Sequence, residues 1–141
     1  MTALKYLALW LIAFVGISVV DAFWHLVIWG KIYGEGIKKV ASLVDGKLVF
    51  NNISGLLSQV LVITAFVVLC ALNLKSDKPY FMGIISCLMG GILGISVYGL
   101  VNHWLIKDWG LIITILEVIW GPLIGSFAGL FIVWSGKLLK I

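Results

Sequence analysis

The sequence has few charges and no arginine. Of its 141 residues, 11% are charged, and all ten basic residues are lysines. Soluble domains carry about 25% charged residues, so a chain this poor in charge does not have the composition of a water-soluble protein. The net charge of +4 is small and scattered along the chain, which leaves nucleic-acid binding without a basic patch to support it. The lack of charge therefore excludes a soluble globular domain.

Cysteine and proline are also scarce, with two residues of each. Cys70 and Cys87 lie in apolar segments without CxxC or zinc-type spacing, so they indicate neither a disulfide framework nor a metal site. Serine-hydrolase, phosphate-loop and HExxH motifs are missing as well. We therefore do not expect the chain to be an enzyme on its own, although a single buried carboxyl group can serve as acid and base in membrane lipid enzymes.

Long apolar segments make up most of the chain, which is 62% hydrophobic. A helix that spans a membrane needs about 20 mainly apolar residues. Four windows reach this length, at about 6–29, 53–74, 80–106 and 110–135. They predict an all-α integral membrane protein, a single domain over residues 1–141, folded as an antiparallel four-helix bundle.

The link between the first two predicted spans is the only sizeable polar segment. Four of its apolar residues recur at helical spacing: Ile37, Val40, Leu43 and Val44. This pattern predicts a short helix on the membrane surface that ends at the turn-like Asp45-Gly46 pair, and a solvated loop is the equal alternative.

The lysines do not determine the orientation of the chain. Four spans place both termini on one side of the membrane, and each side then carries five lysines. Lys5, Lys75, Lys78, Lys137 and Lys140 lie on the terminal side, and Lys31, Lys38, Lys39, Lys47 and Lys107 on the other. The positive-inside rule therefore leaves both orientations, and dual topology, open.

Two carboxylates stand inside the predicted spans, each three residues before a tryptophan. Asp21 precedes Trp24 in the first span, and Glu117 precedes Trp120 in the fourth. Each acid lies ten residues from the lysine at the end of its span, which places both about 15 Å from the same membrane face. An unpaired charge at this depth costs about 2.5–3.5 kcal/mol, so each acid needs a proton, a partner or a water-filled cavity.

Other polar side chains fall in the same half of the membrane, which predicts a polar pocket open to one face. The residues expected at this site, for binding a ligand or a proton, are Asp21, Trp24, His25, Gln59, Tyr98, Asn102, Glu117 and Trp120. The carboxylates would hold the polar group of a small amphipathic or lipid-like ligand, or exchange a proton. The structural alternative is a set of hydrogen bonds between helices that only fixes their packing.

Glycines predict where the helices approach most closely. Gly121, Gly125 and Gly129 follow Glu117 at four-residue spacing, and Gly90 and Gly94 lie on the third span. Small residues at this spacing allow the backbones of neighbouring helices to come together, so we expect these faces to point into the bundle.

Residues near both ends of the chain follow the pattern of a known family. The pattern is Asp21-x2-Trp24-x8-Tyr33, then Tyr98-x3-Asn102, Trp109 and Glu117-x2-Trp120-Gly121. It resembles a family of small bacterial predicted membrane proteins known only as a domain of unknown function, over almost the whole chain except a variable middle. The family usually has aspartate at the position of Glu117, which keeps the carboxylate.

The resemblance implies a four-span protein of the bacterial inner membrane. Members of the family often stand near genes for fatty-acid or membrane-lipid modification, which implies an accessory role in that chemistry. The family does not require histidine at the positions of His25 and His103, which weakens the alternative that these two residues ligate a haem between the first and third spans. We therefore expect no cofactor and no metal.

Two other functions stay open at the level of sequence. The buried acids and the even distribution of lysines also suit a small proton-coupled transporter that works as a dimer. A subunit without a ligand is the third alternative, and it would bind a partner membrane protein through the glycine face of Gly121, Gly125 and Gly129. In every case the expected surroundings are membrane lipids and not nucleic acid.

Overall fold

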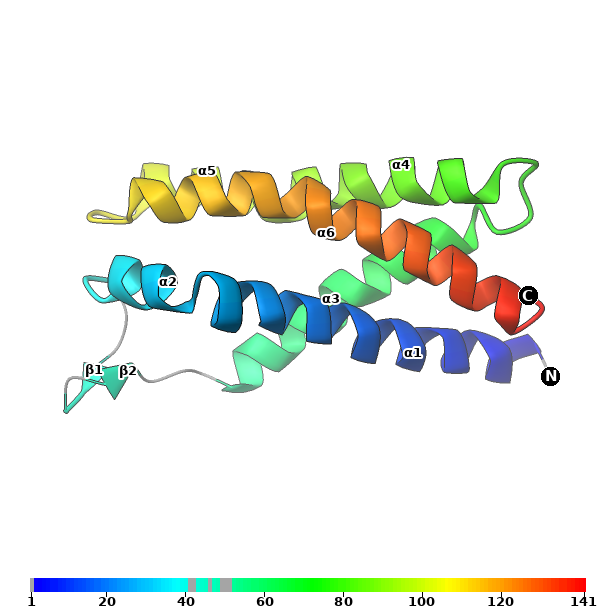
Figure 1. The fold of residues 1–141 in the computed structure, drawn as a ribbon, viewed down its shortest axis with the longest axis horizontal. Coiled ribbons are helices and arrows are strands. Elements are labelled where there is room, and N and C mark those ends of the chain that lie inside the picture. The colour runs from blue at the N-terminus through cyan, green and yellow to red at the C-terminus, as the bar shows by residue number, and fades with distance from the viewer. Residues whose placement is uncertain (1, 41–42, 46, 49–51) are drawn as a thin grey trace.

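The structure, a computed structural model, describes residues 2–40, 43–45, 47–48 and 52–141 of the chain (Figure 1). Within these residues, four helices are long and apolar enough to cross a membrane. They are Ala3–Ile28, Asn52–Ala71, Pro79–Leu105 and Leu111–Leu138. Each end lies within three residues of the predicted window, so the all-α, four-span architecture is confirmed.

Two of the four spans are interrupted by π-helical segments. The first span consists of α1 (Thr2–Ala22) and η1 (Phe23–Ile28), and the third of α4 (Pro79–Gly91), η2 (Ile92–Ser96) and α5 (Val97–Leu105). The second span is α3 (Asn52–Ala71) and the fourth is α6 (Leu111–Leu138). A π-helical segment accommodates an extra residue and so changes which side chains face the neighbouring helices, and such segments are frequent at functional sites.

The link between the first two spans contains a short helix, but not at the residues predicted. Its helix, α2 (Gly30–Ile37), starts directly after Trp29, whose non-helical backbone (φ −117°, ψ 8°) separates it from η1. The predicted helix through Leu43 and Val44 is wrong, because these residues form β1 (Leu43–Val44), which pairs antiparallel with β2 (Lys47–Leu48). Asp45 has a positive φ of 51° between the strands, a turn conformation that ends any helix. Gly46 lies outside the described residues.

The last span, α6, is the centre of the bundle. In its apolar window 44% of the residues are buried, against 11–22% in the other three spans. Figure 1 shows α4 and α5 along one side of α6 and α1 along the other, while α3 crosses the bundle obliquely. The core that α6 shares with the other spans consists of Leu9, Ala13, Ile17, Ile63, Phe66, Val67, Cys70, Cys87, Trp120, Ile124, Ala128, Ile132 and Val133.

Glycines allow α6 to touch the third span backbone to backbone. A Cβ atom at Gly121, Gly125 or Gly129 would overlap the main chain or side chains of α4 and η2, including the carbonyl oxygens of Gly91 and Cys87. All three α6 glycines are buried. The stripe at four-residue spacing therefore lies against the third span and is not free for a partner protein, which removes the docking face expected for an assembly subunit.

Gly90 and Gly94, the two glycines of the third span that were expected to face into the bundle, differ in what they contact. Gly90 lies against α3, where a Cβ atom would approach Leu69 and Phe66 at 3.1 and 3.3 Å. The prediction that Gly94 packs against a neighbouring helix is wrong, because a Cβ atom there would meet nothing within 4 Å. Gly94 instead borders a cavity.

A proline in the middle of α6 is accommodated by a serine of η2. Pro122 has no N–H group, so the carbonyl oxygen of Val118, one turn earlier, loses its usual helical partner. The Ser96 hydroxyl group donates a hydrogen bond of 2.9 Å to this oxygen. Freed carbonyl groups inside a membrane must find such a partner, because no water or lipid atom can donate to them.

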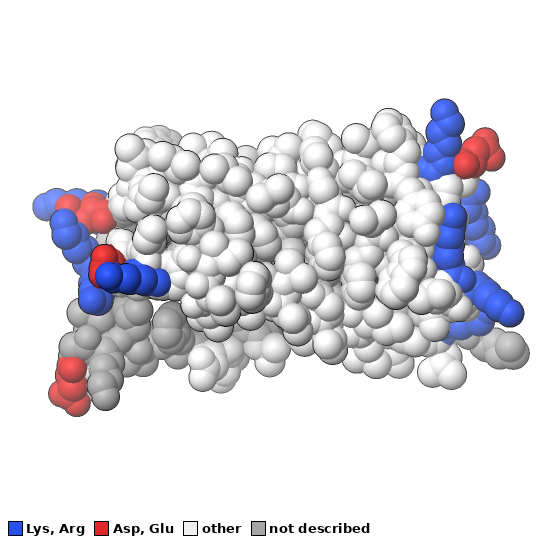
Figure 2. Space-filling view, in the orientation of Figure 1, with Lys and Arg blue, Asp and Glu red and all other residues white. Residues whose placement is uncertain are grey.

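Charged side chains gather at the two ends of the molecule. Figure 2 shows lysines and acids at both ends, with a broad uncharged band between them on the visible face. The band matches the four apolar spans, so the distribution of charge agrees with a protein that crosses a membrane.

Candidate functional site

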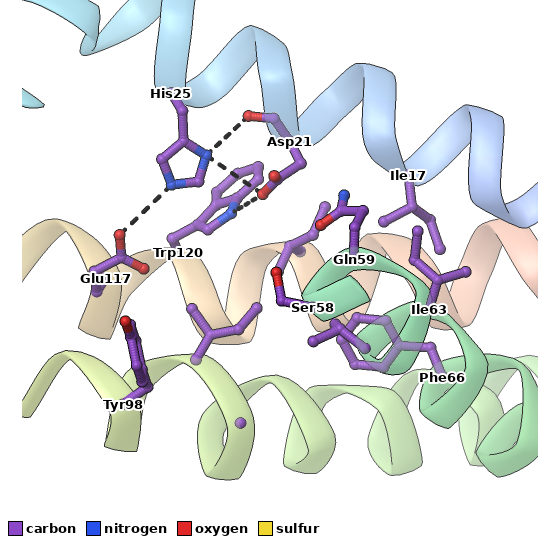
Figure 3. A pocket seen from close by; sticks show the side chains of 14 residues that line it. Ile17, Asp21, His25, Ser58, Gln59, Ile63, Phe66, Tyr98, Glu117 and Trp120 are labelled. Atoms are coloured by element: carbon purple, nitrogen blue, oxygen red, sulfur yellow. Dashed lines mark hydrogen bonds and ion pairs between the residues drawn. The ribbon is translucent and has the colours of Figure 1, made fainter. Parts of the chain in front are cut away.

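Five polar and aromatic side chains meet inside the bundle, and we call them the acid–histidine cluster: Asp21, His25, Tyr33, Glu117 and Trp120. They come from α1, η1, α2 and α6 (Figure 3 shows all but Tyr33). The cluster therefore joins the first span, the link that follows it and the last span.

His25 stands between the two carboxylates. Its Nδ1 atom lies 2.9 Å from the backbone oxygen of Asp21 and 3.4 Å from the Oδ1 atom of the same residue, while its Nε2 atom lies 3.5 Å from Glu117 Oε1. A backbone oxygen can only accept, so Nδ1 carries the hydrogen atom. Nε2 faces the Glu117 carboxyl group at the distance of an ion pair. The imidazole ring of His25 therefore bridges the two acids.

Tyr33 fixes Glu117 from the side of the link. Its hydroxyl group donates a hydrogen bond of 2.9 Å to Glu117 Oε1, and its ring meets the His25 ring edge to face at 4.8 Å. Burial raises the pKa of Tyr33 well above its ordinary value, and the nearby charge of Glu117 raises it further. Tyr33 therefore keeps its proton and remains a donor throughout the neutral pH range.

Trp120 holds the other carboxylate. Its indole Nε1 atom donates a hydrogen bond of 2.8 Å to Asp21 Oδ1, and its ring stacks on Trp24 with centroids 4.4 Å apart and planes inclined by 12°. The side chains of Asp21 and His25 are 29% and 28% exposed, and that of Glu117 is 13% exposed. Both acids thus have partners that offset the cost of burying them.

The cluster opens onto a cavity of about 340 Å³ between the four spans. Polar groups of Asp21, His25, Ser58, Gln59, Tyr98, Glu117 and Trp120 border one part of it (Figure 3). The rest is apolar and lined by Ile17, Val62, Ile63, Phe66, Ile95 and Ile124, with Gly94 in η2 leaving open space. A pocket with a polar and an apolar part suits an amphipathic molecule.

A second, more open cavity of about 830 Å³ lies between α1 and α3. It shares Asp21, His25, Ser58 and Gln59 with the first cavity. Gln59 also donates a hydrogen bond of 3.3 Å to the Ser18 hydroxyl group, across the boundary between the two helices. The acid–histidine cluster is therefore reached from two sides.

Both carboxylates lie near the same end of the bundle. Asp21 stands seven residues before Ile28, where the first span ends, and Glu117 six residues after Leu111, where the last begins. At a rise of about 1.5 Å per residue, each acid is about 10 Å from the end of its span. The sequence placed both on one side, and the structure brings them to His25 on that side.

Two of the predicted site residues do not line the first cavity. Trp24 stacks on Trp120 and does not line this cavity itself. Asn102 is buried, and its Nδ2 atom has no hydrogen-bond partner among the described residues. Gly99, one turn before Asn102, packs on the side chain of Glu117, so this part of α5 faces α6 and closes the cavity.

Tyr33 was missing from the predicted site. The only sign of it in the sequence was its place in the family pattern, nine residues beyond Trp24. Spacing along a straight helix could not bring it to Glu117, because the backbone bends at Trp29 before α2 begins.

The second histidine is separate from the cluster. His103 is exposed near the end of α5, with its Nδ1 atom 3.3 Å from the carbonyl oxygen of Trp109. His25 is engaged by Asp21 and Glu117. Across the described parts of the chain, no three His, Cys, Asp or Glu side chains are arranged to hold a metal ion.

Comparison with known proteins identifies one family. No curated protein and no solved structure shows significant similarity to the chain. The model of one family, described as "Predicted membrane protein (DUF2177)", matches residues 6–134, which include every residue of the acid–histidine cluster. The match spans all four candidate membrane helices almost completely. The chain therefore belongs to this family of predicted membrane proteins of unknown function.

Proposed function

We propose that the protein binds a small amphipathic, lipid-like molecule in the cavity between its four spans, in the inner membrane of a bacterium. The observation that carries the proposal is the junction of the acid–histidine cluster with an apolar cavity inside the bundle. The polar group of the ligand would lie against Asp21 and Glu117, and its apolar part against the isoleucines and Phe66. Such an arrangement binds a molecule by both of its ends.

The charges at the cavity indicate which polar group fits. Two carboxylates face one histidine, and no lysine stands among the described residues that line the cavity. An anionic group would be repelled, whereas a hydroxyl or amino group could donate hydrogen bonds to Glu117, Asp21 or Gln59. We therefore expect an uncharged or cationic polar group, such as that of a long-chain alcohol or amine.

Binding without chemistry fits the cluster better than catalysis. Glu117 Oε1 is engaged by Tyr33 and His25, and Asp21 Oδ1 by Trp120, so these groups are held in place by other side chains. A protein that holds a lipid-like molecule in this way would serve as an accessory to a membrane enzyme that modifies it.

Gly94 allows the cavity to be filled without changing any polar group. Because a Cβ atom at this position meets nothing within 4 Å, Gly94→Leu should place a side chain in the cavity and leave the cluster and helix packing intact. Gly34→Leu on α2 is the matched control, since a Cβ atom there is also unobstructed and the residue does not line the cavity.

The test compares the lipids and small amphiphiles that copurify with each variant in mild detergent, by native mass spectrometry. Gly94→Leu and Glu117→Gln should lose a ligand that the parent and Gly34→Leu retain, with helical content unchanged by circular dichroism. Asp77→Asn, at an exposed acid outside the spans, should also retain it. Identical profiles for the parent and Gly94→Leu would contradict the proposal.

The contact of 3.5 Å between His25 and Glu117 favours a second candidate, a small proton-coupled transporter that works as a dimer. The cluster borders two cavities, through which a proton could reach His25. In vesicles that contain a pH-sensitive dye, Glu117→Gln should slow proton entry relative to the parent. Cysteines placed at Asp77 and Asp108, at opposite ends of the bundle, test dual topology: a single fixed orientation counts against this candidate.

A further inference from the structure

The far end of the molecule carries an aromatic groove that the acid–histidine cluster does not use. Its volume is about 480 Å³, and it is lined by Tyr80, Phe127, Leu130, Phe131 and Trp134. Tyr80 comes from the first turn of α4. The other four residues belong to α6. The groove therefore lies on the part of α6 nearest the chain termini (Figure 1).

Contacts between rings hold the groove in shape. Phe127 and Phe131 stack with centroids 5.5 Å apart, and Phe131 lies 5.9 Å from Trp134. The ring of Phe131 lies over Gly16 of α1, where a Cβ atom would overlap it. Leu130 and Trp134 are 49% and 50% exposed to the surroundings, which at this position are lipid. The groove thus offers a preformed apolar surface to an acyl chain.

A lysine closes the groove at its outer end. Lys137 Nζ lies 4.2 Å from the centroid of the Tyr80 ring, a cation–π contact that positions the ammonium group and leaves its hydrogen atoms available. The first turn of α4 starts beside it at Pro79, without a side-chain cap at Lys78. The free N–H groups of such a turn favour an anion, as the lysine does.

The charge of this whole end points to the same kind of partner. Five lysines stand here against one acid, Asp77, whereas the other end carries five lysines against three acids, Glu35, Asp45 and Asp108. Figure 2 shows the lysines of this end at the right of the molecule. A second copy of the chain at the groove in a parallel pair would bring two lysine-rich ends together and repel, while an anionic lipid neutralises them.

We propose that the groove binds an anionic phospholipid. One acyl chain lies along Phe127, Phe131 and Trp134, and the phosphate group lies at Lys137 next to the start of α4. This site is independent of the ligand proposed for the inner cavity, because the two lie toward opposite ends of α6 and share no residue.

The test measures the fluorescence of Trp134 in vesicles that carry bromine atoms on their acyl chains. The signal of Trp134 is the difference between the parent and Trp134→Phe. Equal mole fractions of brominated phosphatidylglycerol or brominated phosphatidylcholine are added to unbrominated phosphatidylcholine. In the parent, the anionic lipid should quench Trp134 at a several-fold lower mole fraction than the zwitterionic lipid does.

Lys137→Gln should reduce this preference by about five-fold, the factor that one lysine at a membrane surface contributes. Lys107→Gln is the matched control, because it removes an exposed lysine at the other end, and it should leave the preference unchanged. Equal quenching by both lipids in the parent would overturn the proposal. So would a preference that survives Lys137→Gln, or one that Lys107→Gln abolishes to the same extent.

Discussion

The hydrogen bond between Ser96 and Val118 should contribute to the free energy of unfolding only because Pro122 is present. Ser96→Ala removes the donor from a carbonyl oxygen that the proline ring has already deprived of its helical partner. Ser96 is 5% exposed, so water cannot replace it. An unsatisfied buried carbonyl group costs about 1–3 kcal/mol, while hydrogen bonds between membrane helices contribute about 0.6 kcal/mol on average and at most about 1.7. We therefore expect Ser96→Ala to lower the free energy of unfolding by about 1 kcal/mol.

Pro122→Ala restores an N–H group that can donate to Val118 within α6. In this background Ser96→Ala should cost only a few tenths of a kcal/mol, which makes the coupling between the two positions about 1 kcal/mol. The four proteins of the cycle are compared by unfolding in mixed micelles with increasing dodecyl sulfate, followed by circular dichroism. Ser58→Ala is the control, since its hydroxyl group bonds to Gly55 in an exposed turn of its own helix. An equal cost of Ser96→Ala in both backgrounds would refute the reasoning.

Other predictions follow from the cluster and from the glycine stripe. Tyr33→Phe removes a hydrogen bond to a carboxylate and should lower the free energy of unfolding by about 1.5–3 kcal/mol in the same assay; no change would mean that Glu117 does not need this donor. Because the folded state raises the pKa of Tyr33, the unfolded state loses this proton first, so stability should fall as the pH rises above about 10. Tyr33→Phe should show a shallower fall, and identical pH profiles would contradict the assigned burial. Gly125→Val forces a side chain into the Cys87 backbone and should unfold or separate the third and fourth spans, whereas Gly34→Val should not; a normally folded Gly125→Val protein would rule out the close approach.

Much of the arrangement could be predicted from the sequence by counting residues along straight helices. Asp21 and Glu117 were expected on one side because each stands at the same distance from the end of its span, and the structure places both against His25. The spacing of Gly121, Gly125 and Gly129 likewise identified the face of α6 that lies against the third span. These features depend on the α-helical repeat alone, which the sequence shows directly.

The remaining features depend on departures from that repeat. The bend at Trp29 sends α2 back toward α6 and brings Tyr33 to Glu117, and no apolar periodicity signals such a bend. The π-helical segment η2 holds Gly94 beside a cavity, although glycine in a membrane helix usually marks close packing. Asn102 was assigned to the pocket by its depth, but the packing of Gly99 on Glu117 closes that face of α5. Depth alone therefore could not decide the direction of each side chain.

The position of α6 has a consequence for the order in which the protein can assemble. The helix that fills the centre of the bundle is made after the other three spans, since chains emerge from the N-terminus. Until it enters the membrane, Asp21, His25 and Ser96 have none of their partners on α6. The first three spans therefore enter the bilayer before these three residues have their partners on α6, and the acid–histidine cluster is completed only when the fourth span joins them.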